Sequence, residues 1–181
     1  MFRYTLTALL FSAISVVPAF AQTKAEVAAQ NIQLAITLCV QNSHDGAALR
    51  AAFASTGHSY TAEDFGGGEV RHHYGTPDAT VATAVSLRGP TPHCSISTDQ
   101  YGVSQMIPFA RAVLDQLYEG PIWDGSPEAV NVTLNSPDAA SKSCSGFHIL
   151  PGRTVIWFQF GTQGQDPVCV ENGTAQIMIS L

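Results

Sequence analysis

The sequence has few charged residues and lacks a basic surface pattern. Lysine, arginine, aspartate and glutamate together make up 12% of its 181 residues, with 8 basic side chains against 14 acidic ones. The basic residues are scattered singly, whereas binding to a phosphate backbone or an anionic lipid surface requires a basic patch. We therefore expect no nucleic-acid partner.

Local motifs for catalysis are also absent. The chain has no G-x-S-x-G, H-E-x-x-H or C-x-x-C pattern, and its glycine run, Gly66 to Gly68, lacks the lysine of a phosphate-binding loop. Ser43, His44 and Asp45 are consecutive, and three consecutive residues cannot adopt the geometry of a catalytic triad. Asp45 is better explained as a helix N-cap. We expect no cofactor.

No apolar run is long enough to cross a membrane, and the longest one belongs to a signal peptide, residues 1–21. Arg3 supplies a positive start, residues 5–17 are apolar, and Ala19-Phe20-Ala21 is a small-x-small cleavage site. An apolar run of 13 residues is shorter than the ~20 that a spanning helix needs. We expect a bacterial protein that starts at Gln22 after export, is periplasmic or secreted, and does not insert into the membrane.

The remaining chain has the size of one domain. Removal of 21 residues leaves 181 − 21 = 160, and loss of Arg3 makes the formal charge 7 − 14 = −7. A chain of this length can bury roughly two-thirds of its unfolded surface. We expect a single α+β domain over 22–181, and the sequence leaves open a division into an α/β part, 22–120, and a β-rich part, 121–181.

Four cysteines in an exported chain predict two disulfides. They are Cys39, Cys94, Cys144 and Cys169. We favour Cys39 with Cys94 and Cys144 with Cys169, because each pair then lies within one half of the chain. A four-cysteine zinc site is disfavoured, since no two cysteines have the C-x-x-C spacing.

Apolar periodicity predicts two or three helices. Residues 25–41 have apolar side chains at spacings of three and four, which places Cys39 toward the core. A short helix follows Asp45 and ends at Gly57. A third amphipathic segment covers residues 103–117, and Pro108 suggests that its regular part starts near that residue.

Alternating residues and turn signals predict strands in the rest of the chain. The expected strands cover residues 69–74, 81–87, 93–98, 130–134, 143–149, 154–160 and 175–181. The order of elements favours an α+β fold with a mostly antiparallel sheet and a β-rich C-terminal third.

Adjacent histidines, His72 and His73, raise the question of a metal site. Successive side chains of a strand point to opposite faces, so the two cannot bind one ion. We expect His72 to lie beside the core with Val70 and Tyr74, and His73 to be exposed. The alternative metal site uses His58, His72, His93 and Glu69, a set that suits zinc or copper.

Two tryptophans are candidates for contacts. Trp157 belongs to a strand with large apolar groups on both faces and is expected in the core. Trp123 lies in a segment rich in turn residues and is the candidate binding residue, since aromatic residues in loops are frequent binding anchors.

These patterns favour a non-enzymatic, exported binding or interaction module. We expect the loops 61–68 and 121–127 to contact a protein or an envelope ligand. The alternative is a small periplasmic hydrolase or metal-binding protein that uses the four residues of the metal alternative. Convergence of histidines in a concave pocket would favour the alternative.

Overall fold

The fold is a single eight-stranded antiparallel sheet with three helices, seen in a computed structural model that describes residues 22–88, 91–124, 143–162 and 175–181. The helices are α1 (Lys24–Gln41), α2 (Gly46–Ala54) and α3 (Val103–Leu117). The strands are β1 (Ser59–Gly66), β2 (Glu69–Gly75), β3 (Ala82–Arg88), β4 (Thr91–Thr98), β5 (Trp123–Asp124), β6 (Ser143–Ile149), β7 (Ile156–Thr162) and β8 (Ala175–Ser180). The α+β prediction is confirmed.

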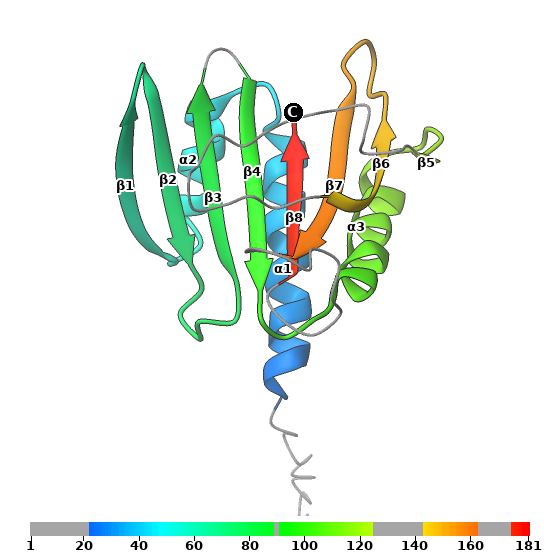
Figure 1. Cartoon of the computed structure of the whole chain (residues 1–181), viewed down its shortest axis with the longest axis horizontal. Coiled ribbons are helices and arrows are strands. Elements are labelled where there is room, and N and C mark those ends of the chain that lie inside the picture. Colours follow the sequence, from blue (N-terminus) through cyan, green and yellow to red (C-terminus); the bar gives the residue numbers. More distant parts are fainter. Residues whose placement is uncertain (1–21, 89–90, 125–142, 163–174) are drawn as a thin grey trace, which may run out of the picture.

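The strand order is β1-β2-β3-β4-β8-β7-β6-β5, and every neighbouring pair is antiparallel. The last strand, β8, lies between β4 and β7, so strands from both halves of the chain form one sheet (Figure 1). The expected strand at 130–134 lies outside the described residues.

All three helices lie on one face of the sheet (Figure 1). The helix α1 contacts β4, α3 contacts β7 and β8, and Phe53 of α2 stacks on Tyr74 of β2 with ring centroids 4.8 Å apart. Ile32, Met106 and Phe158 are fully buried between these layers. The core therefore occupies the space between the helices and the sheet, and the opposite face of the sheet, called the open face below, is free of these helices.

Local sequence explains where α1 and α2 start. Thr23 caps α1: its hydroxyl accepts the N–H of Glu26, whose carboxylate accepts the N–H of Thr23 in return. Asp45 caps α2, as expected, by accepting N–H groups from its first turn. Both helices confirm the predicted ranges to within a few residues.

The third helix begins earlier than predicted. It starts at Val103, five residues before Pro108, and Gly102 donates its N–H to the Gln105 side chain at 2.9 Å. Val103 and Met106 are buried. Their packing and the cap stabilise the turn before Pro108, so the expectation that the regular helix starts near the proline is wrong.

One disulfide joins Cys39 of α1 to Cys94 of β4, with the two Cα atoms 6.3 Å apart. Both residues are buried, and the pairing is the expected one. It is the one disulfide within the described residues, not two. The expected partner of Cys144 is Cys169, which lies outside them.

The segment expected as the loop 61–68 is instead a strand and its turn. Strand β1 spans Ser59–Gly66 and pairs with β2, and Gly66, Gly67 and Gly68 all have φ between 62° and 84°. Every residue of β1 is exposed, so no alternation of apolar side chains marks it in the sequence. In the other expected loop, 121–127, Trp123 and Asp124 form β5, and residues 125–127 lie outside the described part.

Among the described residues, no helix combines the length and the apolar character required to cross a membrane.

Candidate ligand-binding site

The open face is built from cross-strand rows of side chains. Residues opposite one another in a sheet point to the same side, and alternate residues of each strand point into the core. The register gives three rows away from the helices. The first row is Ser59, Gly75, Ala82, Ser97, Gln176 and Gly161; the second is Thr61, His73, Ala84, Ser95, Met178 and Gln159; the third is Glu63, Arg71, Ser86, His93, Ser180 and Trp157.

The open face is hollowed over its central strands. The hollow has a volume of about 400 Å³, and side chains from all three rows line it. Its centre lies over β3 and β4, where Ala82, Ala84 and Ser95 are short. Longer side chains flank it, His73 on β2 and Met178 on β8. The hollow therefore follows from the size of the side chains in each row.

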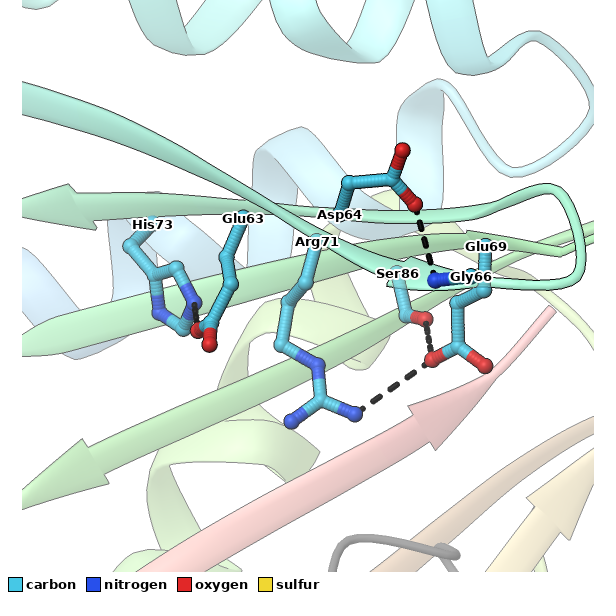
Figure 2. Close-up of polar contacts among 7 residues, drawn as sticks. All are labelled: Glu63, Asp64, Gly66, Glu69, Arg71, His73 and Ser86. Carbon is cyan, nitrogen blue, oxygen red and sulfur yellow. Dashed lines mark hydrogen bonds and ion pairs between the residues drawn. The ribbon is translucent and has the colours of Figure 1, made fainter.

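A polar cluster occupies the side of the open face formed by β2 and β3 (Figure 2). Glu69 Oε1 accepts a hydrogen bond from the Ser86 hydroxyl at 2.7 Å and forms an ion pair with Arg71 at 3.3 Å. The Arg71 guanidinium also lies over the Phe65 ring, 4.1 Å from its centroid. The one permanent positive charge that faces the hollow among its described lining residues is thus neutralised by Glu69.

His73 and Glu63 form a second contact in this cluster. His73 Nε2 lies 3.8 Å from Glu63 Oε2, and both side chains are partly exposed. Figure 2 shows Asp64 on the other side of the strands, where its carboxylate accepts the Gly66 N–H at 2.8 Å. Asp64 thus stabilises the hairpin turn, and Glu63 faces the cluster.

His93 is a neutral, half-buried histidine at the same side of the hollow. It lies on β4 opposite Ser86 and Ser180. Burial lowers the pKa of its imidazole, and the negative charge of Glu69 acts in the opposite direction more weakly. Its Nδ1 is buried and has no hydrogen-bond partner among the described residues. His93 therefore holds a buried polar atom that no described residue satisfies.

Gln176 supplies a second polar atom of this kind. Its side chain lines the hollow, it is 5% exposed, and its Nε2 donates to the Ser95 hydroxyl oxygen. Its Oε1 is buried and lacks a hydrogen-bond partner within the described part of the chain. A buried acceptor without a donor is costly, by about 1–3 kcal/mol. This acceptor belongs to a side chain that lines the hollow.

The structure separates the four residues of the metal alternative. His72 is 8% exposed on the helix side, where its Nδ1 lies 2.9 Å from the Tyr60 hydroxyl. His58 lies on that side too, beside the Phe53 ring. Glu69 and His93 lie on the open face. In the described ranges, no group of three or more histidine, cysteine, aspartate or glutamate side chains could hold a metal ion.

The environment of His72 agrees with its expected place beside the core. Burial lowers the pKa of its imidazole, and the charges of Arg50 and His73 act in the same direction. His73 points to the opposite face of β2 and is the more exposed of the two. The expected division of the doublet between two faces is confirmed.

The tryptophans form a stack at the far side of the open face. Trp123 is 39% exposed and stacks on His148 with centroids 5.3 Å apart, and His148 lies 4.6 Å from Trp157. Trp157 is half-buried on the open face, whereas Phe158 and Phe160 of the same strand are fully buried. Trp157 is therefore not in the core as expected, because the helices cover only the other face.

Sequence reasoning missed the residues that form the hollow. Ser95, Gln176, Ala84 and Arg71 belong to no recognisable motif. The available signal was the alternation in residues 82–87, where Ala82, Ala84 and Ser86 are shorter than the residues between them.

Comparison of the chain with known proteins found no matching family model, no matching curated protein and no matching solved structure.

Proposed function

We propose that this chain is an exported, non-enzymatic binding module that holds a small molecule in the hollow of its open face. The main support is the hollow itself, which has a volume of about 400 Å³ and is lined by Gln176, whose buried Oε1 has no hydrogen-bond partner among the described residues. Pockets for small ligands usually have about 300–1,000 Å³ and a few convergent polar groups. A concave site favours a small ligand over a flat protein partner.

A hydrolase is the second candidate, because Ser86 and His93 are opposite each other on β3 and β4. In a serine hydrolase the hydroxyl donates to the histidine, and an acid orients that histidine. Here the Ser86 hydroxyl donates directly to Glu69, and Ser86 is 8% exposed. The binding module therefore explains the geometry better. We expect equal hydrolysis of p-nitrophenyl acetate by the wild type and Ser86→Ala; a loss in the variant would favour the hydrolase.

Export and a second disulfide, Cys144 with Cys169, belong to the same proposal. A bacterial periplasm is oxidising, and two disulfides suit a protein that functions there. We expect the protein recovered from a periplasm to have a mass that begins at Gln22 and four thiols that become alkylated only after reduction. A free thiol before reduction would contradict the second disulfide, and a mass that includes Met1 would contradict cleavage of the signal.

The binding site is tested by filling the hollow. Ala84 lies at its centre, so Ala84→Leu places a larger side chain where the ligand would lie. Ala62→Leu is the matched control, because Ala62 is exposed and points to the other face of the same sheet. Both variants should unfold at temperatures close to that of the wild type.

The measurement is saturation-transfer NMR with the low-molecular-weight fraction of a bacterial extract. We expect one or more compounds to receive saturation from the wild type and from Ala62→Leu, and to lose it with Ala84→Leu. If no compound is bound by the wild type, or if Ala84→Leu binds the same compounds equally well, the hollow is not the binding site.

A further inference from the structure

The hollow has a chemistry specific enough to define the class of its ligand. We infer that it binds a neutral carbohydrate of mono- or disaccharide size, with hydroxyl or amide groups that both donate and accept hydrogen bonds; this inference rests on the proposed binding function. The reasons are the charge of the lining, the pairing of its polar atoms and the nature of its floor.

The lining disfavours charged ligands. Arg71 is the one permanently charged residue among the described residues that line the hollow, and Glu69 neutralises it at 3.3 Å. An anionic ligand would compete with Glu69 for this guanidinium. A cationic ligand would find no carboxylate among the described lining residues, and it would meet Arg71 and a neutral His93 whose pKa is lowered by burial. A neutral molecule avoids both costs.

The polar atoms in the hollow require a ligand that donates and accepts side by side. Gln176 Oε1 is buried and can only accept, so a ligand that contacts it after rotation of the amide must donate an N–H or O–H. The Ser95 oxygen accepts from Gln176 Nε2, which leaves its own hydroxyl proton to donate. Nearby, the Ser97 hydroxyl donates to the Ala82 carbonyl at 3.3 Å and can accept from the ligand. Sugar hydroxyls and secondary amides provide such adjacent donors and acceptors.

The floor of the hollow suits the C–H groups of a sugar ring. Ala82 and Ala84 lie at the floor, and Met178 flanks it on β8. Their methyl groups and the polarisable Met178 thioether contact apolar ligand surface well. A pyranose presents C–H groups on its faces and hydroxyls on its rim. The hollow, with an apolar floor and polar sides, has the complementary arrangement.

The test compares three sugars that share a ring and differ in charge. N-acetylglucosamine is neutral, glucuronate is anionic, and glucosamine in its ammonium form is cationic. Each is titrated into ¹⁵N-labelled protein, and amide shifts are followed at Ser95, Gln176 and Met178. We expect saturable shifts with the neutral sugar. Its affinity should be at least about tenfold higher than that of either charged sugar, because each charged sugar bears the cost of placing its charge in this lining.

Two variants connect binding to the proposed contacts. Gln176→Met removes the acceptor and keeps the length of the side chain, and we expect it to weaken binding of N-acetylglucosamine by about tenfold. Gln116→Met, at an exposed position of α3, is the matched control and should bind like the wild type. Ala84→Leu blocks the hollow sterically and keeps the test valid if Gln176→Met fails to fold.

The outcomes separate this inference from the proposed function. Stronger binding of glucuronate or glucosamine at the same residues would overturn the neutral-ligand inference and leave the binding function standing. If none of the three sugars binds but compounds from the extract bind to the wild type and not to Ala84→Leu, the carbohydrate inference is overturned and the binding function remains. If neither the sugars nor the extract gives binding, both proposals are wrong.

Discussion

The disulfide between Cys39 and Cys94 should account for a large part of the stability of the fold. It closes a loop with a sequence separation of 55. In the loop-entropy model, a loop of this length corresponds to about 4 kcal/mol of free energy of unfolding. For a domain of this size, 1 kcal/mol shifts the melting temperature by about 2–4 °C, so loss of the bond should lower it by roughly 8–16 °C.

A double-mutant cycle tests this value. Cys39→Ala and Cys94→Ala should each lower the free energy of unfolding by about 4 kcal/mol, since either change removes the whole bond. The double variant should cost little more than one single variant, which gives a coupling energy of about 4 kcal/mol. Alanine is preferred to serine because both sites are buried and a hydroxyl would need a partner. Urea unfolding without reductant, followed by circular dichroism, measures each value. Additive losses would refute the bond.

Three further changes test local features of the fold. His72→Ala should lower the free energy of unfolding by about 1–3 kcal/mol, because the His72 side chain is buried and hydrogen-bonded. His73→Ala should change the free energy of unfolding by less than about 0.5 kcal/mol, because the His73 side chain is partly exposed. The reverse order in urea unfolding would contradict the assigned faces. Burial holds the pKa of His93 below its usual value near 6.5, so the unfolded chain takes up the proton first as the pH falls. The free energy of unfolding should therefore decrease as the pH falls below about 6.5, and a smaller pH dependence in His93→Gln, measured by urea unfolding at several pH values, checks that this residue contributes. Asp45→Ala should cost about 1 kcal/mol through loss of the α2 cap, and an unchanged melting temperature would show that the cap adds nothing.

The sequence predicted the elements whose signals are local. Alternation in residues 69–74 and 81–87 predicted β2 and β3, and the apolar spacing in residues 25–41 predicted α1. Strand β1 was missed because all of its residues are exposed, so no apolar alternation distinguishes it from a loop. Strand β1 is identified only by its pairing with β2, and pairing between strands is not visible in a local stretch of sequence.

The site was beyond local prediction for the same reason. Strand β8 is the last in the chain, yet it pairs with β4 and brings Gln176 opposite Ser97 and Met178 opposite Ser95. No spacing between these residues indicates that they meet. Their side chains are also of types with no characteristic chemistry, so the histidines drew attention instead. Of the residues proposed for a metal, only Glu69 and His93 lie on the open face.

The scarcity of charge in the sequence acquires a physical meaning from the open face. A sheet face that only contacts water tolerates charged side chains, and lysine, glutamate, arginine and aspartate are normally frequent on such surfaces. In the three rows, however, the positions on β3, β4 and β8 contain no lysine, arginine, aspartate or glutamate, only alanine, serine, histidine, glutamine and methionine. These central strands of the face therefore also lack the charges that usually prevent unwanted association. Ser86, Gln176 and Met178 of these rows are buried, and burial accounts for the lack of charge at their positions. The neutral polar ligand proposed for the hollow gives a reason for the short, uncharged side chains of Ala82, Ala84 and Ser95 at its centre.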